Sequence, residues 1–213
     1  NIYNGLANKP SGLIPSSIAG ISAPKKQFKF DLKKGQELVE HSNFDKKKSI
    51  KLSYVASSNE YWKTCLMLQA NCKKIGLNID LHAGLWSEIW AKAREFKTSP
   101  NIIEMAWWPT YASPSDWLYN MFSSQEKPLF NLSYYSNAKI DSLIEVAKRL
   151  EGVNNKKSFE IYSQIQSTLI EDCVVIPIAD LNAWIVTKKN LVGFKNNPAY
   201  ATILFYSLER NSN

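Results

Sequence analysis

The strongest constraint on the fold is a strand, helix, strand pattern in the first half of the chain. IKLSYV (50–55) and LNIDLHA (77–83) alternate apolar and polar residues, as half-buried strands do. Residues 58–76 between them carry apolar side chains at helical spacing, and short connections join the three segments. We therefore expect a βαβ unit with two parallel strands and a right-handed crossover, which makes the chain an α/β protein.

The helix in this unit has clear signals at both of its ends. Ser58 or Asn59 is placed to cap the first turn, and Gly76 occupies the position after the last turn that favours glycine. The residues at helical spacing are Trp62, Cys65, Leu66, Gln69, Cys72 and Ile75. Because Trp62 belongs to this apolar face, we expect its ring to lie in the core.

The charge pattern argues against a nucleic-acid-binding protein. The chain has 213 residues, 45% of them apolar, and a formal net charge of +7. Much of this charge comes from short lysine clusters scattered along the sequence, whereas nucleic-acid-binding proteins gather charge on one face and use arginine for bidentate contacts. We therefore expect a solvated surface and no nucleic-acid partner.

The three cysteines indicate neither a disulfide nor a metal site. Cys65 and Cys72 lie two turns apart on the expected helix, so their Cα atoms are ~10 Å apart, too far for a disulfide. Cys173 stands alone, and no spacing of cysteines and histidines is typical of a metal site. We expect no metal and no cofactor.

Similar local signals predict the remaining elements. Helices are expected over 31–41, 86–96, 114–122, 137–152 and 154–173, and strands over 101–108, 174–179, 182–188 and 201–208. The expected N-caps are Asp31, Ser87, Ser113 and Asn137. The two strands on either side of residues 180–181 are expected to pair with each other, and Pro177 favours the edge of a sheet.

The segment EMAWWPTYASPSDWL (104–118) combines large aromatic residues with residues that form turns. Its aromatic residues are Trp107, Trp108, Tyr111 and Trp117. The segment continues directly from the strand expected over 101–108, and ligands of open α/β sheets lie just beyond the carboxyl ends of strands. We therefore interpret PTYASPSD (109–116) as a binding loop.

The order of these segments resembles the C-terminal portion of family 5 of the extracellular solute-binding proteins of ABC transporters, the oligopeptide- and dipeptide-binding type. The segments that carry the resemblance are YNGLANKPSGLIPSS, FDLKKGQELVEHSNF, CKKIGLNIDL, the WW motif with the residues after it, YYSNAKIDSLIEVA and EIYSQIQSTLIEDCVVIPI. Each motif alone is weak, but together and in this order they extend nearly from end to end of the chain.

The resemblance implies a lobe of the periplasmic-binding-protein type II fold, with a mixed sheet flanked by helices. It implies a hinge-side segment at 1–30, the ligand-binding lobe at 31–180, and strands at 181–213 that return toward the hinge and the other lobe. Members of the family are more than twice as long and trap the ligand between two lobes. The N-terminal lobe of the same polypeptide is therefore an expected partner of this chain.

Carried over by position, the resemblance also implies a set of ligand-binding residues. These are Trp86, Trp107, Trp108, Thr110 and Tyr111. Thr110 takes the place of an aspartate that pairs with the α-ammonium group of the peptide in similar peptide binders, a contact that threonine cannot make. Core packing remains an alternative for Trp107. Asp116 is the nearest carboxylate, but its place at a helix start favours a structural role with the helix dipole.

Aromatic residues with few charges suit the apolar side chains of a peptide and equally the C–H faces of sugar rings. The resemblance implies the substrate-binding component of an ABC importer, which captures peptides for the permease subunits, with oligosaccharides as the alternative ligand. A hydrolytic enzyme is the alternative of another class, but the sequence has no Ser/His/Asp set, nucleophile elbow, P-loop or HExxH motif. We expect no enzyme, and an extracellular or periplasmic protein that is membrane-anchored at full length.

Overall fold

The computed structural model of the chain describes residues 2–18, 20–182, 185–195 and 205–211. The chain divides into two compact units. The first comprises Asn1–Tyr3, Phe28–Ala106 and Lys127–Leu132, and the second comprises Asn4–Gln27, Trp107–Glu126 and Ser133–Asn213. Each unit has a hydrophobic core of its own.

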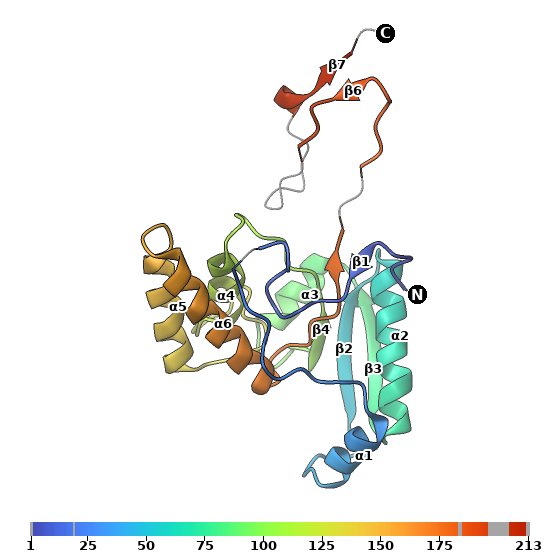
Figure 1. The fold of residues 1–213 in the computed structure, drawn as a ribbon. Helices are drawn as coiled ribbons and strands as arrows, with labels where there is room; N and C mark the ends of the chain where they lie inside the picture. The colour runs from blue at the N-terminus through green and yellow to red at the C-terminus, as the bar shows by residue number, and fades with distance from the viewer. Residues whose placement is uncertain (1, 19, 183–184, 196–204, 212–213) are drawn as a thin grey trace. The chain divides into compact units, whose positions relative to one another are not determined.

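The first unit is built on a parallel sheet (Figure 1). Its strands are β2 (Ser49–Val55), β3 (Asn78–Gly84) and β4 (Ile102–Glu104), in the order β3-β2-β4. Ile50 pairs with Ile79 and Leu52 pairs with Ile102, both in parallel register. Helix α2 (Asn59–Lys74) connects β2 to β3, so the predicted βαβ unit is confirmed. All three strands of this sheet are parallel, and the antiparallel pairs of the described chain lie in separate small sheets.

The ends of α2 form as the sequence predicts. The Ser58 hydroxyl accepts a hydrogen bond from the Tyr61 N–H at 3.2 Å. Beyond the last turn, Gly76 has a φ of +84° and donates to the Lys73 carbonyl, and the Leu77 N–H donates to the Cys72 carbonyl at 3.0 Å. These two bonds form a Schellman motif, which favours glycine because its backbone adopts a positive φ without strain.

The core of the first unit corrects the prediction for Trp62. The buried core residues here are Leu52, Tyr54, Cys65 and Ile79, with Tyr61, Leu68 and Cys72 packed against them. The face of α2 that meets the sheet therefore follows the spacing of Tyr61, Cys65, Leu68 and Cys72. Trp62 lies to one side of this face and is 45% exposed, so the prediction that it belongs to the core is wrong.

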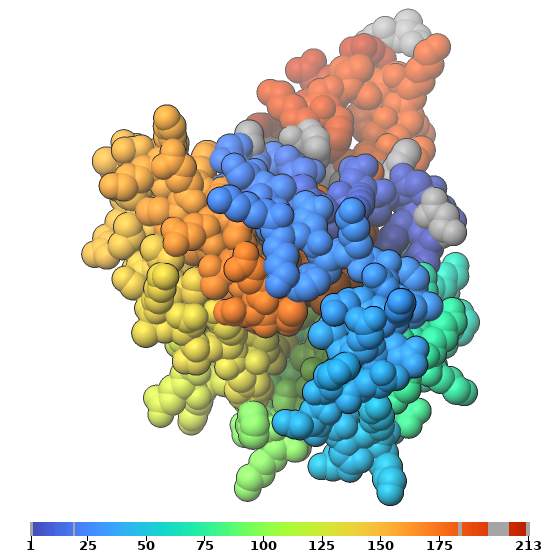
Figure 2. Space-filling view, turned by 60° about the horizontal axis from the view of Figure 1, so that its bottom comes forward, coloured from blue at the N-terminus to red at the C-terminus, as the bar shows by residue number. Residues whose placement is uncertain are grey.

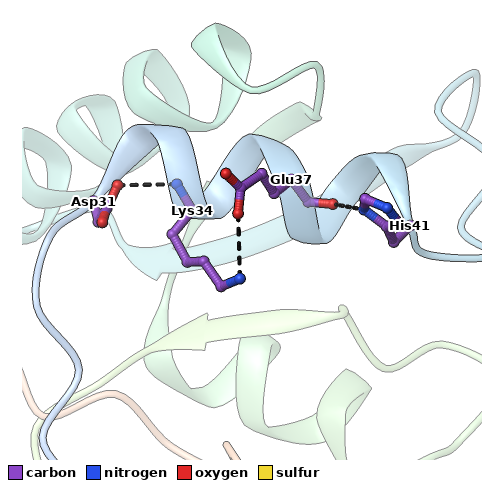
Figure 3. Close-up of polar contacts among 4 residues, drawn as sticks. All are labelled: Asp31, Lys34, Glu37 and His41. Atoms are coloured by element: carbon purple, nitrogen blue, oxygen red, sulfur yellow. Dashed lines mark hydrogen bonds and ion pairs between the residues drawn. The ribbon is translucent and has the colours of Figure 1, made fainter.

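Helix α1 (Leu32–Glu40) precedes β2 and has the N-cap that was predicted (Figure 3). The Asp31 carboxylate accepts a hydrogen bond from the Lys34 N–H at 2.9 Å. The Lys34 ammonium lies 3.2 Å from the Glu37 carboxylate, and His41 Nδ1 lies 2.6 Å from the Glu37 carbonyl oxygen. The side chains of the two capping residues, Asp31 and His41, thus contact the backbone of the helix at its two ends.

Helix α3 (Trp86–Ala93) follows β3 after one residue. Its N-cap is Leu85, which makes no side-chain capping bond, so the prediction of Ser87 as the cap is wrong. Later in the helix, Trp90 Nε1 donates to the Leu129 carbonyl at 2.7 Å, and Arg94 lies over the Trp90 ring. The bond from Trp90, with a second one from Arg94 Nε to the Pro128 carbonyl at 2.8 Å, connects α3 to the Lys127–Leu132 segment of the same unit.

The second unit is helical. It contains α4 (Pro114–Phe122), α5 (Ala138–Leu150) and α6 (Asn155–Glu171). Its buried core consists of Ile14, Leu118, Phe122, Ile140, Ile144, Ala147, Tyr162, Ile165 and Leu169. Asn137 caps α5 as predicted, and Asn154 caps α6.

The N-terminal segment of the second unit lies along α6 (Figure 2). Gln166, which is 1% exposed, accepts a hydrogen bond from the Leu13 N–H at 3.2 Å and donates to the Ser22 carbonyl. A Cβ at Gly12 would lie 2.4 Å from Gln166 Oε1, so glycine permits this close approach. Strand β1 (Ala7–Asn8) of the same segment pairs antiparallel with β5 (Asp180–Leu181).

The last part of the chain differs from the prediction. Residues 174–179 are not assigned to a strand, and β5 pairs with β1 rather than with the 182–188 segment, of which residues 183–184 lie outside the described chain. Of the strand expected over 201–208, residues 201–204 lie outside the described residues, and Phe205–Ser207 form the 3₁₀ helix η1. Strands β6 (Leu191–Val192) and β7 (Glu209–Arg210) form a local antiparallel pair. The division into functional segments at 1–30, 31–180 and 181–213 stays a prediction.

Candidate functional site

The aromatic loop, defined here as residues 107–113, is held by a buried carboxylate at the start of α4. Asp116 is 1% exposed. Its Oδ2 accepts hydrogen bonds from Trp107 Nε1 at 3.1 Å and from the Thr110 N–H at 3.2 Å. Its Oδ1 accepts a bond from Asn120 Nδ2 at 3.1 Å. Asp116 therefore has the structural role that was predicted, but it acts chiefly by binding donors of the loop.

The local sequence explains why Asp116 lies at this position. Ser113 is the N-cap of α4 and accepts a hydrogen bond from the Ser115 N–H, and Pro114 is the first helical residue, where its missing N–H costs nothing. Asp116 then falls in the first turn, where the helix dipole favours a negative charge. The helix start thus directs the Asp116 carboxylate to the loop that precedes it.

A second carboxylate, Glu151, holds the other end of the loop. Glu151 is the C-cap of α5 and accepts hydrogen bonds from the Ser113 hydroxyl at 2.7 Å, the Ser115 hydroxyl at 3.2 Å and the Tyr162 hydroxyl at 2.5 Å. Burial and the bond to Glu151 raise the pKa of the Tyr162 hydroxyl, so it stays protonated and donates. Sequence reasoning missed Glu151 because the loop and the end of α5 are distant along the chain.

With both ends fixed, the loop presents aromatic rings to solvent. Trp108 is 53% exposed and Tyr111 is 44% exposed, and Thr110 is exposed as well. Trp107 is half-buried with its indole N–H bonded to Asp116. The Tyr111 hydroxyl lies 3.1 Å from the Ser115 hydroxyl, which limits where the ring can move. Large exposed rings on an anchored loop are typical of a binding surface rather than of a core.

The predicted site residues fall in both units. Trp107, Trp108, Thr110 and Tyr111 belong to the aromatic loop of the second unit. Trp86 belongs to the first unit, where it is the first residue of α3, just past the carboxyl end of β3, and is half-buried. The assignment of all five as ligand-binding residues stays a prediction.

Glu104 was not among the predicted site residues, although it lies at the end of β4. It is 9% exposed. Burial raises the pKa of its carboxyl from 4.5 to about 7. Tyr3, Tyr61 and Cys65 lie close enough for the Glu104 charge to contribute to the raised pKa values of their own side chains, after burial as the larger cause for each of them. The signal available in the sequence was a single acidic residue at the carboxyl end of an otherwise apolar strand.

Two further observations on the described residues concern metal ions and membranes. They contain no group of three or more His, Cys, Asp and Glu side chains that could hold a metal ion. Among the same residues, no helix has the length and apolar character needed to span a membrane.

The sequence matches a known family of proteins. Residues 1–128 match the family model described as bacterial extracellular solute-binding proteins, family 5 middle. This match covers more than half of the chain, and the chain belongs to that family. The resemblance seen in the sequence motifs is thereby confirmed.

Known relatives and solved structures agree with this assignment. The chain is 24% identical over 211 residues to the dipeptide-binding protein of Pseudomonas aeruginosa, covering 97% of this chain and 39% of that protein. It is 26% identical over 202 residues to the probable D,D-dipeptide-binding periplasmic protein of Escherichia coli, covering 92% of this chain and 37% of that protein. The crystal structure of the dipeptide-binding protein from Pseudoalteromonas sp. SM9913 in complex with Met-Leu superposes with a TM-score of 0.79 at 16% identity, covering 98% of this chain and 41% of that one.

These matches confirm the fold class, a lobe of the periplasmic-binding-protein type II fold. The family and these relatives are binding proteins. The chain spans about two fifths of the length of the curated relatives it matches.

Proposed function

We propose that the protein containing this chain is the substrate-binding component of an ABC importer that captures peptides. Membership of the solute-binding family supports capture and delivery to permease subunits. Peptide binding is favoured because the relatives described above carry the names of dipeptide-binding proteins. The same family membership favours an extracellular or periplasmic location and, in the full-length protein, attachment to the membrane. The function is binding rather than catalysis.

The observation that carries the proposal is the anchored aromatic loop. Asp116 and Glu151 hold its ends, so Trp108 and Tyr111 are presented in fixed positions while much of each ring remains open to solvent. An ordered aromatic surface binds apolar side chains with little loss of conformational entropy. Oligosaccharides are the second candidate, because the same rings can stack on the C–H faces of sugars.

Binding would couple to closure of the two lobes of the complete protein. A ligand that contacts both lobes stabilises the closed state over the open one, by as much as its difference in affinity for the two states. The closed form would then bind the permease subunits. The N-terminal lobe would supply the other contacts of such a cleft.

The identity of the ligand is tested on the full-length protein. We would purify it from cells grown in rich medium, denature it, and identify the released small molecules by mass spectrometry. Peptides are the expected result. Oligosaccharides without peptides would replace the proposal by the second candidate, and a nickel complex or another ligand class would refute both.

The site is tested with matched pairs of variants. Trp108→Ala and Tyr111→Ala are expected to weaken binding of the recovered ligand at least tenfold, because each removes a ring of the loop. Trp62→Ala and Tyr119→Ala are the controls, since these rings lie outside the loop and are 45% and 40% exposed, close to the 53% and 44% of the loop residues. Equal affinities for loop variants and controls would refute the site.

A further inference from the structure

Glu104 is a largely buried carboxylate that has no protein partner within the described residues. It is 9% exposed, and neither a hydrogen bond nor an ion pair to its carboxylate occurs in the described chain. No buried side-chain oxygen or nitrogen there lacks a partner, so the Glu104 oxygens retain some contact with solvent. Buried polar groups are almost always paired, and an unpaired carboxylate destabilises the fold unless something binds it. The Glu104 carboxylate is therefore largely buried in the first unit and retains a small solvent-exposed area.

The position of Glu104 in the sheet is the one at which ligands of α/β proteins bind. It is the last residue of β4, and it pairs with Tyr54 near the end of the central strand β2. On the other side of β2, Tyr54 pairs with Ala83, and β3 then leads within three residues to Trp86 at the start of α3. Since the three strands are parallel, their carboxyl ends share one edge of the sheet.

We propose that Glu104 binds a positively charged group of the ligand, an ammonium or guanidinium group, at the carboxyl edge of this sheet. The inference rests on the proposed function and names the chemistry that the first unit contributes to it. Thr110 cannot pair with a cation, and the carboxylates of Asp116 and Glu151 are already taken up by donors of the aromatic loop and its helices. Of these three carboxylates, Glu104 is the one that accepts no hydrogen bond within the described residues.

The three described side chains whose pKa values the Glu104 charge helps to raise are uncharged in the pH range in which Glu104 titrates. Tyr61 and Cys65 on α2, and Tyr3, lie close enough to Glu104 for its charge to contribute to their raised pKa values. Burial raises the pKa of both tyrosine hydroxyls and raises that of the Cys65 thiol to about 12. Glu60, at the start of α2, contributes to the raised pKa of Tyr3. These surroundings supply no positive charge, so a bound cation would be the charge that offsets Glu104.

Binding of a cation by Glu104 depends on its ionised form. With a pKa of about 7 in the empty protein, Glu104 is mostly ionised at pH 8 and only about one tenth ionised at pH 6. The affinity for a ligand whose cation is a lysine side chain should therefore fall roughly tenfold between pH 8 and pH 6, because lysine stays charged over this range. For a free amino terminus the fall should be smaller, because the α-ammonium begins to lose its proton near pH 8. The affinity for a ligand without a positive charge should not follow this profile.

The test uses the full-length protein, freed of bound ligand and immobilised, with three synthetic libraries of peptides of two to five residues. The first library contains apolar residues and a free amino terminus. The second is the same library with the amino terminus acetylated, and the third is acetylated and contains one lysine. Retained peptides are quantified by mass spectrometry for the wild type, for Glu104→Gln, and for Glu95→Gln as a control with the same charge change at an exposed position.

The expected result is that the wild type retains a positively charged library at least tenfold better than the acetylated, lysine-free one. Preference for the first library would identify the ligand group as the α-ammonium, and preference for the third would identify a basic side chain. Glu104→Gln should lose this preference at least tenfold and should lose the pH profile, while Glu95→Gln should keep both. The wild-type profile between pH 6 and 8 tests the inference without any variant.

Two outcomes would overturn the inference alone: equal retention of charged and uncharged libraries by the wild type, or an unchanged preference in Glu104→Gln. Either could occur in a protein that binds peptides well, so the proposed function would stand. Retention of none of the libraries by the wild type would instead refute the proposed function, and the inference with it.

Discussion

Replacing Asp116 by alanine should loosen the aromatic loop and destabilise the second unit. The carboxylate of Asp116 accepts bonds from Trp107 Nε1, the Thr110 N–H and Asn120 Nδ2, and its own residue is 1% exposed. Alanine leaves all three donors without this acceptor and leaves a small cavity below the loop. We therefore expect a loss in the free energy of unfolding and, through the displaced rings of the loop, weaker ligand binding.

The size of the loss follows from the exposure of the three donors. A hydrogen bond to a charged group contributes about 1.5–3 kcal/mol to stability. Thr110 is exposed and Trp107 is half-buried, so water can replace the carboxylate at both donors, and the bonds do not add in full. We expect Asp116→Ala to cost about 3 kcal/mol. Asp116→Asn keeps one acceptor oxygen but turns an amide toward Asn120, and should cost about 1 kcal/mol.

The assay is urea unfolding of the full-length protein, followed by circular dichroism, for the wild type and both variants. Asp80→Ala is the control, because Asp80 is exposed on β3 and its removal should change stability by no more than about 0.5 kcal/mol. An ordinary hydrogen bond contributes about 1 kcal/mol net. If the free energy of unfolding of Asp116→Ala lies within about 1 kcal/mol of that of the wild type, or if Asp116→Asn loses as much stability as Asp116→Ala, then the three bonds do not hold the loop.

Three further predictions concern Glu104, two tryptophans and two cysteines. Because the pKa of Glu104 is raised from 4.5 to about 7 on folding, the folded state binds the proton more tightly than the unfolded state, and the free energy of unfolding should fall by up to about 3 kcal/mol as pH rises through this window. Urea unfolding at pH 5 and at pH 8 measures this difference, and Glu104→Gln should abolish it. Trp117→Ala should cost about 3–5 kcal/mol because Trp117 is 8% exposed, whereas Trp62→Ala should cost less than about 1 kcal/mol in the same assay. Iodoacetamide at pH 8 should label exposed Cys173 in the native protein and spare Cys65, which is 1% exposed with a thiol pKa of about 12, until urea is added.

The parts of the fold that the sequence predicted well are those that neighbouring residues decide. Gly76 and Leu77 close α2 through bonds to carbonyls only a few residues earlier, and Ser113 and Pro114 start α4 through contacts within one turn. Capping depends on the local backbone and a single side chain, so local sequence is sufficient evidence for it. The βαβ unit was predictable for a similar reason, because short connections leave few alternatives.

The failed predictions depend on residues far away in the sequence. Strand β5 pairs with β1, which lies near the other end of the sequence, and the local sequence around residues 174–188 does not predict this partner. Trp62 has helical spacing with the core residues of α2, but the sheet meets the helix along the face of Cys65, and Trp62 lies beside it. Periodicity identifies an apolar stripe, while the neighbouring element decides which edge of the stripe is covered.

The same distinction between local and distant contacts applies to the candidate site. The aromatic residues Trp108 and Tyr111 were visible in the sequence because rings among turn-forming residues are unusual, and both are exposed in the structure. The carboxylates that support them were not visible as a set. Glu151 acts on Ser113 and Ser115 from the end of α5, so its role appears only when the helices are packed.

Hydrogen-bond donors are distributed unevenly among three carboxylates, and this difference supports our proposal for Glu104. Asp116 accepts bonds from three donor groups and Glu151 accepts bonds from three hydroxyls, so ligand binding at either would have to break bonds that hold the aromatic loop. Glu104 accepts none within the described residues, and a cation there would relieve the cost of its burial. Threonine at position 110 therefore does not imply that ligands of this protein lack a positive charge. In our proposal such a charge is bound by Glu104, and an unaltered preference for cationic peptides in Glu104→Gln would contradict that proposal.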